Sequence, residues 1–107
     1  MSYLDQAEKA LGYLAESEAE YAALKAQHQA LKERMKIVEH QGILDSSEKS
    51  AAMKKSDSMA SQGYSDAVTG WQITVESYEL ISAKRKRAEL TIEMYRSVNS
   101  ALKRGNI

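Results

Sequence analysis

Two stretches of about 40 residues carry apolar side chains at alternating spacings of three and four, and the chain contains no proline. That spacing places the apolar residues along one stripe of an α-helix, the seam through which helices pack in a coiled coil. Proline would interrupt such a helix, because it lacks a backbone donor and collides with the preceding turn. The pattern therefore predicts two long helices, at about residues 3–41 and 65–104.

Each long helix is expected to pack through two rows of seam residues. The rows of the first helix are Ala7, Leu14, Tyr21, His28 and Met35, with Ala10, Ser17, Leu24, Leu31 and Val38. The rows of the last helix are Trp71, Tyr78, Arg85, Ile92 and Asn99, with Thr74, Ile81, Ala88, Tyr95 and Leu102. Gly12 weakens the first helix by about 1 kcal/mol relative to Ala. Gly42 and Gly105 are expected to end the two helices, because glycine favours the conformation that terminates a helix.

The segment 43–63 is rich in serine and weakly patterned. Asp45 and Glu48 have the spacing of a capping box, so we expect a short helix at about residues 46–60. Its apolar face is poor, and serine favours turns over helix interiors. We therefore expect a marginal helix that is mobile or becomes ordered on binding.

The charges indicate how the long helices are arranged. The first 24 residues contain five acidic side chains and one base, whereas residues 82–107 contain seven bases and two acids. An antiparallel hairpin lays the acidic start beside the basic finish and places position i near 107 minus i. Arg85 then lies close to Tyr21 and can reach Glu18 or Glu20, an ion pair that would fix the register. The predicted fold class is all-α: an antiparallel helical hairpin with a marginal third helix in the connector.

Composition limits the chemistry. At 107 residues the chain is expected to form one domain, residues 1–107, with a modest core. Without cysteine it has no disulfide and no thiolate nucleophile, which fits a cytoplasmic protein. The acidic N-terminus does not resemble a signal peptide, and no stretch is apolar enough to span a membrane.

No catalytic, cofactor-binding or metal-binding residue is predicted. His28 occupies a seam position and His40 a helix end, and no Glu-x-x-His pairing accompanies them. There is neither a Gly-x-Ser-x-Gly elbow nor a glycine-rich phosphate loop. We therefore expect a protein without enzymatic activity.

The last helix carries a second apolar strip off its seam, and this strip is the predicted partner interface. It consists of Ile73, Leu80, Leu90, Met94 and Val98. Such a strip is available to a third helix, a second copy of the chain or a different protein. A homodimer around a twofold axis is one alternative.

The basic run at residues 84–87 is a second candidate site, for nucleic acid or an acidic partner. The contacts expected there are Lys84, Lys86, Arg87 and Arg104. Four consecutive helical residues spread over about 300°, so they do not form one face. The competing interpretation is a solvated helix paired with the acidic first helix.

Two families offer comparisons. Gly70–Trp71, the size and the lack of cysteine resemble small secreted helical hairpins that carry a Trp-x-Gly turn, although the order here is Gly-Trp. The segment AKRKRAELTIEMYRS, from Ala83 to Ser97, and the closing LKRGNI resemble small helical proteins from the early regions of bacteriophages. That resemblance implies an accessory or inhibitor protein of the bacterial host cytoplasm. Its expected partner is a host or phage nuclease, recombination or immune component.

Overall fold

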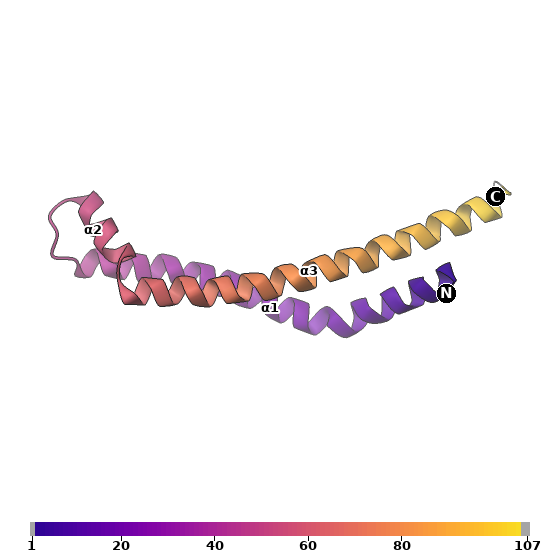
Figure 1. The fold of residues 1–107 in the computed structure, drawn as a ribbon, viewed down its shortest axis with the longest axis horizontal. Helices are drawn as coiled ribbons and strands as arrows, with labels where there is room; N and C mark the ends of the chain where they lie inside the picture. Colours follow the sequence, from indigo (N-terminus) through magenta and orange to yellow (C-terminus); the bar gives the residue numbers. More distant parts are fainter. Residues whose placement is uncertain (1, 106–107) are drawn as a thin grey trace. The chain divides into compact units, whose positions relative to one another are not determined.

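The computed structural model describes residues 2–105, and those residues form three α-helices (Figure 1). They are α1 (Tyr3–Asp45), α2 (Ala51–Met59) and α3 (Gln62–Lys103). Contacts between α1 and α3 pair early residues of one with late residues of the other, as in Ser17 with Arg85 and His28 with Tyr78. The predicted all-α hairpin with a short helix in its connector is confirmed.

Glycines at the two predicted helix ends behave differently. Gly105 has a φ of 72°, and α3 ends at Lys103 as expected. Gly42 instead lies inside α1, which continues to Asp45, so the prediction of a stop at Gly42 is wrong. The missing side chain serves packing there: a Cβ on Gly42 would lie 2.8 Å from Cβ of Ser58 on α2.

Serine hydroxyls cap all three helices. Ser2 Oγ accepts a hydrogen bond from the Asp5 amide at 3.1 Å and begins α1. Ser50 Oγ accepts from the Met53 amide at 3.1 Å, and Ser61 Oγ accepts from the Tyr64 amide at 3.2 Å. These bonds satisfy amides that have no partner within the helix.

The connector differs in detail from the expected one. The helix predicted at 46–60 begins only at Ala51, because Ser50 caps it. The capping box expected from Asp45 and Glu48 is wrong: Asp45 ends α1, and the Glu48 amide donates to Ser46 Oγ at 3.2 Å. The last helix begins at residue 62, three residues before the predicted start.

The contacts divide the chain into two compact units. Unit 1 comprises Met1–Ala22 with Glu79–Ile107, and unit 2 comprises Ala23–Tyr78. Each unit contains a segment of α1 packed against a segment of α3, and unit 2 also contains α2. Because both units draw on both long helices, neither corresponds to a separate stretch of sequence. The expectation of one domain over residues 1–107 stays a prediction.

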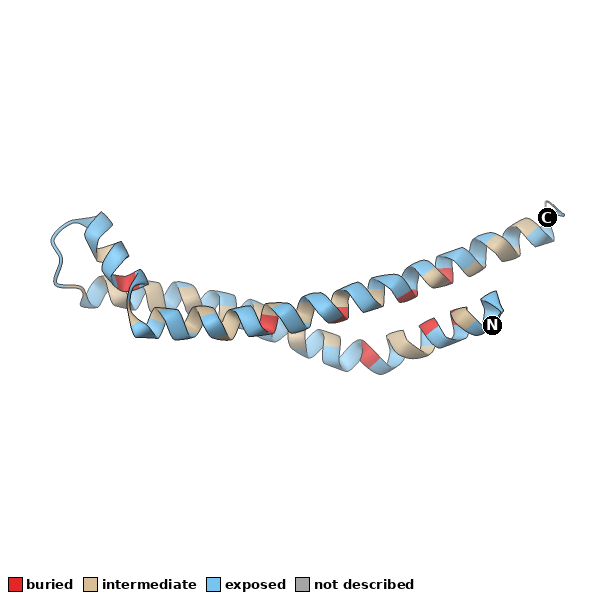
Figure 2. Ribbon diagram, in the orientation of Figure 1, coloured by how far each residue is buried: buried red, intermediate tan, exposed pale blue. Residues whose placement is uncertain are grey.

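Burial follows the predicted seam (Figure 2). Every residue of the four predicted rows except Leu102 is buried or half-buried. In unit 1, Ala10, Ala88 and Ile92 form a cluster, with Tyr13 and Leu14 packed against it. Each helix thus contributes both an alanine and at least one larger side chain to this cluster, and the alanines permit close approach of the helices.

The register is offset from the expected one by about five residues. Ser17 contacts Arg85, and a Cβ on Gly63 would touch Val38, so position i lies level with about 102 minus i rather than 107 minus i. The physical reason is the position of α2. It packs against the last part of α1, at Glu39 and Gly42, so that part of α1 extends past the start of α3.

Candidate functional site

The outer surface of α3 in unit 1 carries large apolar side chains that the described residues leave more than half exposed. Leu80, Leu90 and Met94 are 57%, 53% and 54% exposed, and Val98 is half-buried. Ile73, the fifth member of the predicted strip, is exposed too but belongs to unit 2. Unit 1 therefore brings together four of the five residues predicted for a partner interface.

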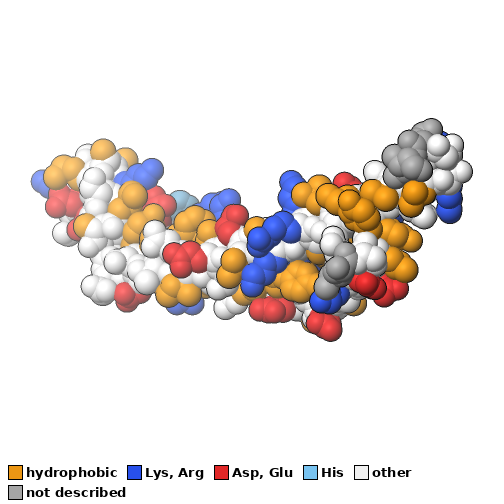
Figure 3. Space-filling model, turned by 45° about the vertical axis from the view of Figure 1, so that its right-hand side comes forward, with side chains coloured by type: hydrophobic (Ala, Val, Ile, Leu, Met, Phe, Trp, Pro, Cys, Tyr) orange, Lys and Arg blue, Asp and Glu red, His pale blue; other side chains and the backbone are white. Residues whose placement is uncertain are grey.

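A groove of ≈ 340 Å³ lies beside this strip, between α1 and α3 of unit 1. It is lined by Gln6, Lys9, Ala10 and Tyr13 of α1 and by Arg87, Ala88 and Thr91 of α3. Ala10 and Ala88 belong to the small core cluster, and Lys9 and Arg87 are exposed bases. The space-filling view shows apolar side chains interspersed with charged ones toward the end that carries the two termini (Figure 3).

Residues seven positions apart lie on the same side of a helix, so this spacing identifies the side chains next to the groove along α1 and α3. From Arg87, steps of seven residues lead to Leu80 and Met94, and from Thr91 to Lys84 and Val98. On α1 they lead from Lys9 to Glu16 and from Tyr13 to Glu20. We call the groove together with these residues the groove face.

The basic residues 84–87 do not form a single surface. Their helical spacing predicted this separation. Arg85 is half-buried in the seam, whereas Lys84, Lys86 and Arg87 are exposed. Of these three, Lys84 and Arg87 lie on the groove face. Lys86 lies on the opposite edge of α3, and Arg104 follows the end of that helix. The four predicted contacts are thus distributed over at least three places.

Arg85 forms a polar layer in the core of unit 1. Its Nη1 donates to the Leu14 carbonyl oxygen at 2.9 Å and to Ser17 Oγ at 2.7 Å. Its guanidinium carbon lies 4.8 Å from the centre of the Tyr21 ring, within the range of a cation–π interaction. The expected proximity to Tyr21 is confirmed.

The expected partner of Arg85, a carboxylate of Glu18 or Glu20, is not the one observed. Both glutamates are exposed, and the offset register aligns Arg85 with Ser17. A carbonyl and a hydroxyl accept from Nη1, and the Tyr21 ring lies under the guanidinium. Arg85 therefore contributes to the packing of unit 1.

Most of the remaining acidic side chains of unit 1 lie on α1 and most of its bases on α3, and the described residues form no ion pair there. The α1 segment holds five acids and one base, and the α3 segment from residue 79 holds seven bases and three acids. Within residues 2–105, the ion pairs closer than 4.0 Å are Lys36–Glu33 and Lys55–Glu39, both in unit 2. The opposite charges of unit 1 thus balance without direct contact.

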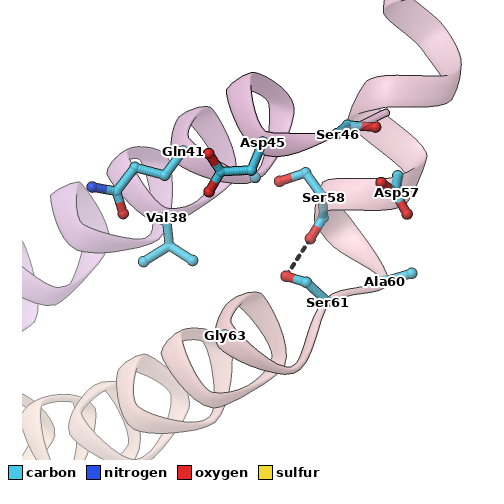
Figure 4. A pocket seen from close by; sticks show the side chains of 10 residues that line it. Val38, Gln41, Asp45, Ser46, Asp57, Ser58, Ala60, Ser61 and Gly63 are labelled. Atoms are coloured by element: carbon cyan, nitrogen blue, oxygen red, sulfur yellow. Dashed lines mark hydrogen bonds between the residues drawn. The ribbon is translucent and has the colours of Figure 1, made fainter. Parts of the chain in front are cut away.

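Unit 2 contains a cleft of ≈ 460 Å³ where α2 meets the end of α1 and the start of α3 (Figure 4). Asp45, Asp57, Ser58 and Ser61 are among its lining residues. Ser58 Oγ donates to the Glu39 carbonyl oxygen, and Ser61 Oγ donates to the Ser58 carbonyl oxygen, both at 2.6 Å. These hydroxyls hold α2 in place against the end of α1 and the start of α3.

The other polar cluster of unit 2 is aromatic. The His28 ring stacks on Tyr78 with centroids 5.1 Å apart and lies 6.0 Å from Trp71. The predicted packed histidine is therefore observed, and Trp71 lies inside α3 beside it. No group of three potential metal ligands occurs within the described residues.

Sequence reasoning missed two exposed leucines on α1. Leu4 and Leu11 are exposed although they lie in unit 1, and they occupy the edge of α1 opposite Tyr13. Their seven-residue spacing beside the predicted rows was the available signal. They lie off the groove face and so provide a control for experiments on it.

Comparison with known protein families, curated proteins and solved structures found no match to this chain. In the part of the chain that the structure describes, neither long helix has an apolar run that could cross a bilayer. The groove face is therefore assigned as the candidate site from its geometry.

Proposed function

We propose that this chain is a non-enzymatic protein-interaction module that binds its partner through the groove face of unit 1. The observation that carries the proposal is the pair of exposed side chains Leu80 and Met94 beside a groove floored by alanines, with Leu90 also exposed on the same helix. Burying a fully exposed large apolar side chain contributes about 1.5–3 kcal/mol. Leu80 and Met94 are 57% and 54% exposed, so covering each of them would contribute roughly half of that.

The proposed mechanism is occlusion or bridging by a helical surface. Small floor residues allow another helix to approach closely, and Lys84 and Arg87 favour an acidic partner surface. The resemblance of the segment Ala83 to Ser97 to early-region phage proteins extends the proposal to an accessory or inhibitor role in the bacterial host cytoplasm. The partner would then be a nuclease, recombination or immune component of host or phage.

Replacement of Leu80 and Met94 by Asp tests the interface, because it places charges where apolar contact is needed. We expect the double variant to keep its helical circular dichroism and to lose partner capture from bacterial lysate. A Leu11→Asp variant is the matched control, since Leu11 is 55% exposed but lies off the groove face. Unchanged capture by the folded double variant would exclude this surface as the interface.

Nuclease treatment of the same lysate separates a protein partner from nucleic acid. The basic residues of α3 would support nucleic-acid binding, and such binding falls steeply with salt. Capture that survives nuclease supports the interaction module. Capture that disappears with nuclease, and on reversing Lys84, Lys86, Arg87 and Arg104 to Glu, would replace it with a nucleic-acid-binding function.

A further inference from the structure

We propose that the groove face is covered by a second copy of this chain, related by a twofold axis that runs along the helices. In this arrangement, the acidic α1 segment of each copy lies against the basic α3 segment of the other. The inference rests on the proposed function, because it uses the same surface. It names a second copy of the chain as the occupant of that surface, in place of the host or phage component that the phage resemblance implies.

The buried core of unit 1 supports this arrangement. Its buried hydrophobic residues are Ala7, Ala10, Ile81, Ala88 and Ile92, three of which are alanines. Alanine buries little apolar surface, whereas Leu80, Leu90 and Met94 remain outside. Packing two groove faces together would bury Leu80 and Met94 in a four-helix core.

The charge pattern selects a second copy over an unrelated protein. In this dimer the twofold axis runs parallel to the helices. The rotation places α1 of one copy opposite α3 of the other. On the groove face, α1 carries the acids Glu16 and Glu20 with the base Lys9, and α3 carries the bases Lys84 and Arg87. The two glutamates of each copy therefore face the two bases of the other. The surface is complementary to itself, as a twofold interface requires.

The register identifies the residues that meet. Position i of α1 lies level with about 102 minus i of α3, so Glu16 and Glu20 are level with residues 82–86. All four side chains Glu16, Glu20, Lys84 and Arg87 lie on the groove face and are exposed. In the dimer, Glu16 and Glu20 of one copy approach Lys84 and Arg87 of the other. None of these four residues has an ion pair within its own chain among the described residues.

Charge reversal tests this pairing. One variant carries Glu16→Lys and Glu20→Lys, and a second carries Lys84→Glu and Arg87→Glu. Each alone places like charges at both contacts of its homodimer, so we expect the dimer dissociation constant to rise at least about tenfold. Mixed in equal amounts, the two variants have opposite charges at both contacts, and we expect a heterodimer of near wild-type affinity.

Sedimentation equilibrium and native mass spectrometry measure these outcomes, with circular dichroism to confirm that each variant is helical. The matched control is the pair Glu8→Lys and Lys86→Glu, which reverses charges of the same helices away from the groove face. We expect this control to leave the dimer unchanged. A folded pair of reversal variants that fails to associate when mixed would overturn the proposal.

The oligomeric state of the wild-type chain is an independent test of the proposed dimer. A chain that stays monomeric at about 100 μM, where weak dimers already form, has no homodimer on this face. If such a monomer loses partner capture with Leu80→Asp and Met94→Asp, the interaction module stands and the second copy is wrong. If neither self-association nor capture occurs, both proposals are wrong.

Discussion

Units 1 and 2 differ in how many helices pack together. Both pair α1 with α3 through one seam, but unit 2 adds α2, which buries Ser58 to 1% exposure against Gly42. Among the described residues, unit 1 has no third helix, and its Leu80, Leu90 and Met94 are exposed. Unit 2 also leaves Ile37, Leu44 and Ile73 exposed. The third helix therefore covers the end of α1 at Glu39 and Gly42, while apolar side chains stay exposed in both units.

The polar residues in the two seams also differ. Unit 1 places Arg85 across the seam, where a charged group donates to backbone and hydroxyl oxygens. Unit 2 places a stacked His28 there, beside Tyr78 and Trp71. Trp71 is the sole tryptophan of the chain, so its fluorescence reports on unit 2 whereas circular dichroism reports on both units. That difference allows the two units to be perturbed and observed separately.

The largest expected effect is that of Gly42→Ala on unit 2. The new Cβ would overlap Ser58 Oγ and lie 3.0 Å from Ser58 Cα, so α2 must move away from α1. We expect a loss of about 3 kcal/mol in the free energy of unfolding, at the upper end for overpacking. Urea unfolding followed by Trp71 fluorescence measures it, and α2 amides should exchange hydrogen faster.

Gly70→Ala is the matched control in the same unit, because a Cβ there meets no atom within 4 Å. It should be neutral or stabilising. Equal destabilisation by both substitutions would show that the loss at Gly42 does not come from contact with Ser58.

Arg85→Ala is the corresponding substitution in unit 1, with a smaller expected effect. It removes two hydrogen bonds from a charged donor and the contact with Tyr21, and we expect a loss of about 2 kcal/mol. Urea unfolding by circular dichroism measures the change. Lys86→Ala, on an exposed neighbour, should shift the midpoint little. A neutral Arg85→Ala would mean that its desolvation cost cancels these contacts.

His28→Ala tests the aromatic cluster of unit 2. Losing the stack on Tyr78 should cost about 1 kcal/mol beyond ordinary truncation and should alter Trp71 emission. The emission spectrum and the urea midpoint are the measurements. His40→Ala, on an exposed residue of the same unit, serves as the control. An unaltered emission spectrum would contradict the observed proximity of the His28 and Trp71 rings.

Gly12→Ala has the smallest expected effect, and it is stabilising. A Cβ at Gly12 meets nothing within 4 Å, so the substitution gains helix propensity without steric cost. We expect a gain of up to about 1 kcal/mol. Thermal unfolding by circular dichroism measures it, and a lower midpoint would show that Gly12 has a packing role that its surroundings do not reveal.

Local spacing explains why most of the fold was predictable. A heptad pattern specifies which side of a helix is buried, so the seam rows and the exposed strip at Leu80 and Met94 could be predicted residue by residue. The ends of the connector helix were harder to predict from the sequence. Asp45 and Ser50 are both good caps, and which of them begins α2 depends on where α1 stops.

The sequence by itself determined the helices, their seams and the separation of charge between α1 and α3, because these depend on neighbours along one helix. Only the tertiary structure decided the register, the use of Gly42 as a packing site and the partners of Arg85. Those features depend on how closely one helix approaches another, and a change of a few residues in register exchanges a carboxylate for a hydroxyl. The groove between the helices has the same origin, since side chains from both α1 and α3 form it.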